Sequence, residues 1–276
     1  MIIFLTGGNG FIGKKFIKEA LSSGHQIYAV SRKKMQNKKN LTWLKGNLDN
    51  DWTTYLKRSH VLIHMAAVGV NKDITLEEAI TANVIKPYKL LINAINSDCA
   101  DWLIIGSASE YGKQAAKKKP LGIKTKELPE TNYEKSKYLF TKLSTSLSVK
   151  FKTRCRVMRL FNVYGEGENK KRLWPSLVRA NKFKKNLHMT DGKQIRDFIS
   201  VDVVVKILLK AAKFETKRKK FPQIWHVASG KPTSVKLFAL KNWKKLGAKK
   251  KILFNKIKSP LSRNYISEKR SIWSIK

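Results

Sequence analysis

Apolar and polar positions follow two different periods along residues 1–160. Continuous apolar runs, typical of strands that are covered on both faces of a sheet, lie at 2–6, 26–31, 60–67, 101–106 and 154–160. Apolar residues recur at helical spacing at 11–21, 79–95 and 133–149. Strands that alternate with helices in this way predict an α/β fold with a doubly wound parallel sheet.

The second half of the chain has a less regular pattern. It predicts helices at 175–181, 201–214 and 233–246 and short strands at 187–189 and 224–228. We find no internal repeat and no Pro/Gly/Ser linker between the halves. We therefore expect residues 1–160 to form one domain, completed by segments near 195–212 and 224–228. Residues 161–276 would form mainly a small C-terminal domain that is interleaved with the first.

The chain is strongly basic, with 58 Lys and Arg against 19 Asp and Glu and a formal net charge of +39. Arginine accounts for only 11 of these positions, and the lysines are spread along the whole chain. Proteins that read nucleic-acid sequence rely on bidentate arginine, and single-strand binders interleave aromatic with basic residues. We therefore expect a solvated basic surface, salt-sensitive binding to polyanions and no specific nucleic-acid partner.

Apolar segments and cysteines limit the cellular setting. No apolar stretch approaches the length of about 18 residues that a membrane span needs. The apolar run at 1–5 meets Gly7 too early for a signal peptide. Cys99 and Cys155 are too few for a disulfide framework. We expect a cytoplasmic protein without a metal site.

A glycine-rich segment, Thr6-Gly-Gly-Asn-Gly-Phe-Ile-Gly13, lies between the first predicted strand and the first predicted helix. There, backbone N–H groups and the positive end of a helix can bind a pyrophosphate. Gly7 permits a tight turn, Gly10 permits close approach of the phosphates, and Gly13 permits helix-on-strand packing. This placement predicts a Rossmann-type dinucleotide site.

The end of the second predicted strand bears on the choice between NAD and NADP. An acidic residue there binds the ribose 2′-hydroxyl of NAD, and a basic residue accommodates the 2′-phosphate of NADP. Ser31, Arg32 and Lys33 occupy this position, and no acid is present. A hydroxyl and a guanidinium favour NADP over NAD.

Seven segments in this order resemble the extended short-chain dehydrogenase/reductase family, in the branch that acts on nucleotide sugars. Together they span about three quarters of the chain. They are TGGNGFIG at 6–13, HMAA at 64–67, Asn83 in ANVIKP, GSASEYG at 106–112, YEKSK at 133–137, RLFNVYGEGE at 159–168 and QIRDFISVD at 194–202. The resemblance implies a homodimer built through helices such as 79–95 and 135–150, and a nucleotide-diphosphate sugar as substrate.

The family's Tyr-x-x-x-Lys motif matches three times, at Tyr133, Tyr138 and Tyr265. Only Tyr133 opens a helix soon after the Ser107 strand and has Ser136 directly before Lys137. We expect Tyr138 to pack within the helix and Tyr265 to be a surface or tail aromatic.

The resemblance implies that Ser107, Tyr133 and Lys137 are catalytic. Residues four apart share a helix face, so the Lys137 ammonium can lie beside the Tyr133 phenol and lower its pKa. Tyr133 would then exchange a proton with the sugar oxygen, and Ser107 would hydrogen-bond that oxygen, with Ser109 assisting.

Further residues carry over from the family. The expected cofactor-binding set is Gly7, Asn9, Gly10, Phe11, Ile12, Gly13, Ser31, Arg32, Asn47, Leu48, Ala66, Ala67, Tyr133 and Lys137. Asn47 replaces the aspartate that often contacts adenine. Asn83 would brace the sheet. Asn162 and Arg196 would bind the sugar nucleotide, Arg196 through the diphosphate; a loop-capping Asn and a surface Arg196–Asp197 pair are the alternatives.

The residues after Ser107 bear on the reaction. A 4,6-dehydratase would need Asp and Glu directly after Ser107, where Ala108 and Ser109 stand. Glu110 comes one position later and would point to the opposite face of an extended strand. A 4-keto-sugar reductase and a 4-epimerase both need only Ser, Tyr and Lys.

We favour the reductase, because the strand end is NADP-like and the segments 82–91 and 192–202 are similar to synthases of CDP-dideoxyhexoses. An NAD-dependent nucleotide-sugar 4-epimerase is the alternative. A more remote one is a non-catalytic NADP-binding scaffold with a basic face that binds RNA or protein.

Overall fold

Seven parallel strands form the central sheet of the computed structural model, which describes residues 1–70, 73–117, 119–213, 221–255 and 263–273. The strands are β1 (Ile2–Thr6), β2 (Gln26–Ser31), β3 (Leu41–Lys45), β4 (Val61–His64), β5 (Asp101–Ser107), β6 (Arg154–Leu160) and β11 (Gln223–Val227). Their order across the sheet is β3-β2-β1-β4-β5-β6-β11. The order reverses direction between β1 and β4, where doubly wound folds open a crevice at the carboxyl ends of the strands.

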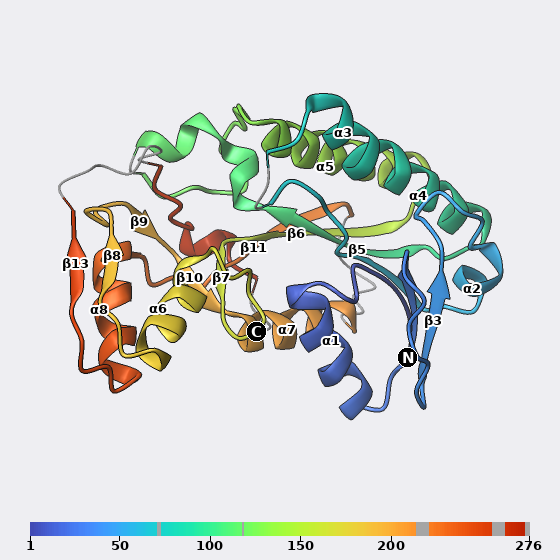
Figure 1. Ribbon diagram of the computed structural model, residues 1–276. Helices are drawn as coiled ribbons and strands as arrows, with labels where there is room; N and C mark the ends of the chain where they lie inside the picture. Colours follow the sequence, from blue (N-terminus) through green and yellow to red (C-terminus); the bar gives the residue numbers. More distant parts are fainter. Residues whose placement is uncertain (71–72, 118, 214–220, 256–262, 274–276) are drawn as a thin grey trace.

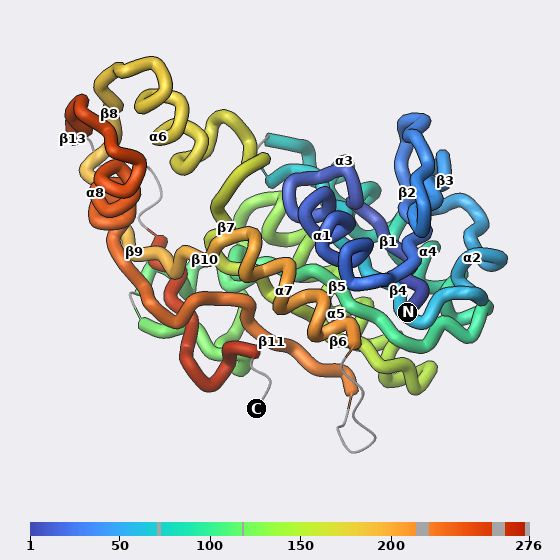
Figure 2. The backbone as a smooth tube through the Cα atoms, turned by 90° about the horizontal axis from the view of Figure 1, so that it is seen from below, coloured from blue at the N-terminus to red at the C-terminus, as the bar shows by residue number. Residues whose placement is uncertain are grey.

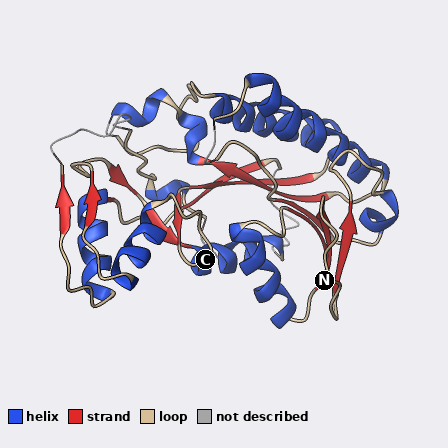
Figure 3. Ribbon diagram, in the orientation of Figure 1, coloured by secondary structure: helices blue, strands red, loops and turns tan. Residues whose placement is uncertain are grey.

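Helices cover both faces of this sheet (Figures 1 and 3). One face carries α1 (Phe11–Ser22) and α7 (Val201–Ala212). The other carries α2 (Thr53–Lys57), α3 (Leu76–Ile80), α4 (Lys86–Asn96) and α5 (Asn132–Lys150). The sheet is thus buried on both sides, which explains why its strands read as continuous apolar runs.

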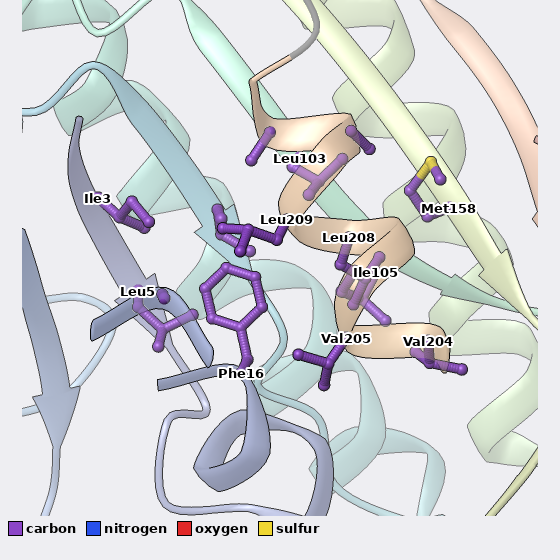
Figure 4. Packing of buried hydrophobic residues seen from close by; sticks show 14 of the residues in the cluster. Ile3, Leu5, Phe16, Leu103, Ile105, Met158, Val204, Val205, Leu208 and Leu209 are labelled. Carbon is purple, nitrogen blue, oxygen red and sulfur yellow. The ribbon is translucent and has the colours of Figure 1, made fainter. Parts of the chain in front are cut away.

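The larger of the two apolar layers packs around Phe16 of α1. Figure 4 shows Phe16 beside Leu5 of β1 and Val205 and Leu208 of α7, and all four side chains are almost fully buried. Truncation of such a phenylalanine to alanine typically costs about 3–5 kcal/mol. This layer therefore holds α1, and with it the glycine loop, firmly against the sheet.

Short strands and two helices gather beyond the carboxyl ends of the central strands, at the end of the molecule away from β3 (Figure 2). They are β7 (Asn162–Tyr164) with β10 (Phe198–Ser200), β9 (Ile195–Arg196) with β12 (Thr233–Ser234), β8 (Leu187–Met189) with β13 (Ile252–Phe254), and the helices α6 (Leu173–Lys182) and α8 (Val235–Lys245). A small apolar cluster around Leu177 and Trp243 joins α6 to α8.

The predicted α/β class and doubly wound parallel sheet are confirmed. Strand β3 was not predicted, and the helix expected at 79–95 begins earlier and contains a π-helical turn at Thr81–Ile85 between α3 and α4. The helix expected at 201–214 ends at Ala212, and Phe214 lies outside the described residues. The division into two domains stays a prediction. Within the described part of the chain, no helix has both the length and the apolar character to cross a membrane.

Candidate active site

A cavity of about 780 Å³ opens at the carboxyl ends of β1, β4, β5 and β6. It brings together many of the residues that the sequence singled out. Those in its wall are Gly7, Gly10, Phe11, Ile12, Gly13, Ala67, Ser107, Ser109, Tyr133, Lys137, Asn162 and Arg196.

The glycine loop forms one wall as a closely packed turn. Gly7 has a φ of +74°, and a Cβ atom there would lie 2.7 Å from the Ala66 backbone nitrogen. A Cβ atom on Gly13 would overlap the Gly7 carbonyl oxygen. The helix α1 begins directly after Gly10 with no acidic residue in its first turn. The first N–H groups of a helix have no partner within the helix, so this cradle at a helix N-terminus fits the pyrophosphate of a dinucleotide.

The other residues expected to bind the cofactor are not among those that line the cavity. Asn9 donates to the Ser31 hydroxyl across 3.4 Å, and Ser31 is buried at the end of β2. Arg32 follows it and is exposed. The Ala66 amide donates to the Thr6 hydroxyl across 3.3 Å, which ties the loop after β4 to β1.

Asn47 and Leu48 occupy the turn after β3. The backbone N–H of Asn47 donates to the Asn50 side-chain oxygen across 2.6 Å. The backbone carbonyl of Asn47 accepts from the Trp52 indole at 2.9 Å. Leu48 packs against the apolar layer that contains Trp52. The turn is therefore held by its own contacts, and its role toward adenine stays a prediction.

Ser107 and Tyr133 come from β5 and α5, two elements that pack on each other. Ser107 is the last residue of β5, and its hydroxyl lies 2.7 Å from the Ser109 hydroxyl. Helix α5 begins at a capping box in which Thr131 accepts from the Glu134 amide and Glu134 accepts from the Thr131 amide. This box places Tyr133 and Lys137 in the first turns of the helix, facing the strand end.

Burial dominates the electrostatics of this pair. Burial raises the pKa of Tyr133 to about 12, against an opposing hydrogen bond with Ser107. Burial also lowers the pKa of Lys137, whose ammonium donates to the Ile105 carbonyl across 2.7 Å. Desolvation of the phenolate outweighs the attraction of the Arg172 cation, and the lowering of this pKa expected from Lys137 together with a bound nicotinamide stays a prediction. Tyr133 keeps its proton at neutral pH and is suited to donate it.

We expected Glu110 to point to the opposite face of an extended strand. The structure shows a different arrangement. Residues Ala108–Tyr111 form a 3₁₀ turn, which brings the Glu110 carboxylate back into the protein interior. One oxygen accepts from the Ser107 amide at 2.7 Å, and the other accepts from Arg159 at 2.9 Å. Among the described residues, the carboxylates in the cavity wall are Glu134 and Glu168, and neither follows Ser107.

A second cavity of about 260 Å³ continues from the first and shares Asn162, Glu168, Arg172 and Arg196 with it. Arg196 stacks on the Tyr265 ring, with its guanidinium carbon 5.2 Å from the ring centre. Burial lowers the pKa of Arg196 to about 10, which leaves it charged at neutral pH. The backbone of Asn162 is held by its N–H group, which donates to the Asp197 backbone carbonyl across 3.1 Å.

The alternative pairing of Arg196 with Asp197 was wrong. Asp197 is fully buried and accepts hydrogen bonds from the Ser229 amide and hydroxyl and from the Gly230 amide. Asp197 is thus used to hold the loop after β11. The Arg196 guanidinium donates to the Ile195 carbonyl across 2.9 Å and remains in the walls of both cavities.

Several residues in these walls were not expected there. Tyr265, predicted to be a surface or tail aromatic, lines the larger cavity. Glu168 has a side chain only 9% exposed, with one oxygen held by Arg172 and the other without a partner among the described residues. The smaller cavity also contains the aromatic residues Tyr164, Trp174, Phe198 and Phe238. The sequence contained one signal for these aromatic residues, namely that Tyr164 lies two positions after Asn162.

Residues 3–228 match the family model described as NAD dependent epimerase/dehydratase family. The chain belongs to this family. Membership confirms the family expected from the motifs and identifies an enzyme that uses a nicotinamide cofactor, for which the glycine cradle is suited.

Two curated relatives match most of the chain. CDP-abequose synthase of Salmonella typhimurium is 28% identical over 86% of this chain and 78% of its own. GDP-6-deoxy-D-talose 4-dehydrogenase of Aggregatibacter actinomycetemcomitans is 27% identical over 78% of this chain and 73% of its own.

Solved structures share the fold over nearly the whole chain. A UDP-N-acetylglucosamine 4-epimerase from Methanobrevibacter ruminantium superposes with a TM-score of 0.85, at 21% identity over 97% of this chain and 88% of that one. A UDP-glucuronic acid 4-epimerase from Bacillus cereus, in complex with UDP-glucuronic acid and NAD, gives 0.81 at 19% identity over 98% and 91%.

Proposed function

We propose that this protein reduces the C4 keto group of a nucleotide-diphosphate sugar with NADPH. The observation that carries the proposal is a cavity that brings the half-buried Tyr133 together with Ser107 and in whose described wall no carboxylate directly follows Ser107. In this reduction the C4 carbon receives a hydride, its oxygen receives a proton, and the C=O group becomes a hydroxyl. Proton donation needs Tyr133 in the form that its raised pKa maintains.

The three catalytic side chains have separate tasks. The Ser107 and Ser109 hydroxyls, 2.7 Å apart, would hold the keto oxygen where Tyr133 can protonate it. Lys137, anchored on the Ile105 carbonyl, would stabilise the negative charge left on Tyr133 after proton transfer. The nicotinamide of the bound cofactor supplies the hydride.

The cofactor and substrate assignments rest on charge. Arg32 is exposed after the end of β2, and Ser31 and Lys33 on either side of it in the sequence are not acidic, which supports NADPH over NADH. Asn162 and Arg196 would hold the diphosphate of the substrate, with guanidinium and phosphate forming a charge-assisted pair. The two curated relatives, a CDP-abequose synthase and a sugar 4-dehydrogenase, support chemistry at C4 of a nucleotide sugar.

The proposal includes a cytoplasmic location. Cys99 and Cys155 are free and buried, and burial raises the pKa of each thiol to about 12. Both thiols are therefore unreactive packing groups and are suited to a reducing compartment. A homodimer formed through α4 and α5 remains part of the same proposal.

A nucleotide-sugar 4-epimerase is the second candidate, because Ser107, Tyr133 and Lys137 would also serve it. An epimerase regenerates its cofactor in each cycle and can retain it, whereas a reductase exchanges its cofactor at every turnover.

The test is to purify the protein, denature it, and identify any dinucleotide that is released. We expect little bound cofactor, and NADPH binding that is about tenfold tighter than NADH binding. In the Arg32→Ala variant this preference should shrink while NADH affinity stays the same. Stoichiometric NAD in the purified protein would overturn the reductase assignment and support the epimerase.

A further inference from the structure

Glu110 is a fully buried carboxylate next to the catalytic strand end, and the chemistry proposed above leaves it without a task. Both of its oxygens are engaged. One accepts from the Ser107 amide at 2.7 Å, and the other pairs with the fully buried Arg159 at 2.9 Å. A buried charge of this kind is costly unless it is paired, so its retention beside Ser107 calls for an explanation.

The space for this carboxylate is provided by a glycine in β5. A Cβ atom on Gly106 would lie 2.9 Å from the Glu110 oxygen and 3.0 Å from a methyl group of Val157. The Ser107 side chain and the Glu110 side chain also form a capping box around the 3₁₀ turn. Strand end, turn and carboxylate are therefore built to fit one another.

Glu110 and Lys137 contact β5 two residues apart: the Lys137 ammonium donates to the Ile105 carbonyl across 2.7 Å, and Glu110 accepts from the Ser107 amide across 2.7 Å. Burial lowers the pKa of Lys137, and the negative charge of Glu110 raises it. Of the other ionisable groups around this lysine, His64 on β4 is neutral because burial lowers its pKa to about 3. On its own helix, Tyr133 keeps its proton and Glu134 is ion-paired with Arg263.

Arg159 has a second carboxylate partner, which provides a matched control. Its guanidinium lies 2.6 Å from Glu127, whose side chain is 12% exposed. Arg159 also lies over the Tyr111 ring, with 4.7 Å between the guanidinium carbon and the ring centre. Glu127 thus shares the arginine with Glu110, while among the described residues Glu127 accepts no hydrogen bond from Ser107 or Lys137.

We propose that Glu110 is a positioning residue that fixes the Ser107 backbone at the strand end and acts as the buried counter-charge of the Lys137 ammonium. The proposal rests on the proposed use of Ser107 and Lys137 and holds for reduction and epimerisation alike. Glu110 itself exchanges no proton with the substrate.

The first test measures Lys137 directly in the Glu110→Gln variant, which keeps an acceptor for the Ser107 amide but removes the charge. Protein labelled with ¹³C at lysine Cε is titrated by NMR, and the Lys137 signal is identified by its absence in Lys137→Arg. We expect the midpoint to fall by about one pH unit or more in Glu110→Gln. In Glu127→Gln it should move by less than about 0.3 unit. An equal midpoint in wild type and Glu110→Gln overturns the counter-charge role, whatever the substrate is.

The second test measures the pH profile of kcat/KM for keto-sugar reduction. Since loss of the ammonium occurs at lower pH without Glu110, the alkaline limb of Glu110→Gln should move down by the same amount as the NMR midpoint. At low pH its activity should stay within about threefold of wild type. A uniform loss at every pH, with no displacement of the limb, would mean that Glu110 is structural only.

Glu110→Asp keeps the proposal open to refutation if the glutamine variant does not fold. The shorter side chain retains the charge but no longer reaches the Ser107 amide, so we expect kcat to fall about tenfold with an unshifted Lys137 midpoint. An unchanged kcat would refute the positioning of Ser107. If wild-type protein reduces no keto-sugar, the proposed function fails, and the NMR titration still decides the role of Glu110.

Discussion

The two sides of the large cavity differ in how far their polar groups are buried and paired. On the sheet side, Ser107, Tyr133 and Lys137 stand on regular elements, and Glu110 and Arg159 behind them are fully buried and paired. On the opposite side, short strands and α6 present partly exposed cations and aromatic rings. The Glu168 oxygen there has no partner among the described residues. The Glu110 carboxylate behind Ser107 thus has both oxygens engaged by the protein, whereas Glu168 on the opposite wall has only one engaged within the described part of the chain.

Replacement of Tyr133 with Phe is expected to have the largest effect on this contrast. The proton donor is lost while the ring and its packing remain, so turnover should fall by about 10²–10⁴-fold with cofactor affinity nearly unchanged. Steady-state kinetics and NADPH titration measure the two quantities. Tyr138→Phe, in the second Tyr-x-x-x-Lys match on the same helix, should stay within about twofold. Survival of turnover within about tenfold in Tyr133→Phe would refute the mechanism.

Gly13→Ala should weaken the binding of dinucleotide by at least about tenfold. The added Cβ atom would overlap the Gly7 carbonyl oxygen and force the phosphate cradle open. Gly247→Ala is the control on the far side of the molecule, where φ is +64° and nothing lies within 4 Å. That variant should lose about 1 kcal/mol of stability without a change in affinity. Equal NADPH affinities of Gly13→Ala and wild type, by fluorescence titration, would argue against a tight cradle.

Arg196→Lys tests the substrate wall. A lysine keeps the charge but loses the planar fork and the stacking on Tyr265, so KM for the nucleotide sugar should rise about tenfold. The kcat value should change by less than about threefold. Lys171, an exposed cation in the smaller cavity, supplies the control variant Lys171→Gln. Comparable KM increases in both variants would mean that this wall attracts phosphate by general charge alone.

Mild acid should have the smallest effect of these changes. It should lower the thermal stability through histidines on the sheet side. Burial lowers the pKa of His64 and of His226 to about 3. Below the ordinary histidine pKa of about 6.5, the unfolded chain binds protons that the folded chain does not, so stability falls with falling pH. We expect Tm to drop by about 5 °C between pH 7.5 and 5.5.

Variants separate the two sides in this acid experiment. His226→Gln should lower Tm at neutral pH and reduce its acid dependence, whereas His188→Gln, at an exposed position of β8, should leave that dependence unchanged. An acid dependence that is the same in all three proteins would assign it to other groups.

The glycine cradle and the catalytic helix could be predicted because their signals are local. Gly7, Gly10 and Gly13 lie within one strand–loop–helix unit, and four-residue spacing places Tyr133 and Lys137 on one helix face. Strand β3 was missed because it has only five residues, and Thr42 and Lys45 among them are polar.

Features that depend on distant contacts could not be predicted. The direction of Glu110 is set by the 3₁₀ turn and by Arg159, which is 49 positions away in the sequence. Tyr265 reaches the cavity because its segment returns beside Arg196, 69 positions earlier, and no periodicity records that return. The sequence therefore identified residues that meet in one cavity, and the structure was needed to show which others line it.

The π-helical turn between α3 and α4 links the loop that follows β4 to helix α5. It presents Asn83, whose amide group bonds both backbone polar groups of Val68 after β4 and the Ser136 hydroxyl on α5, next to Lys137. One side chain therefore connects the loop that follows β4 to the first turns of α5. Binding of a dinucleotide against that loop should stiffen α5, so that cofactor occupancy and readiness for proton transfer rise together.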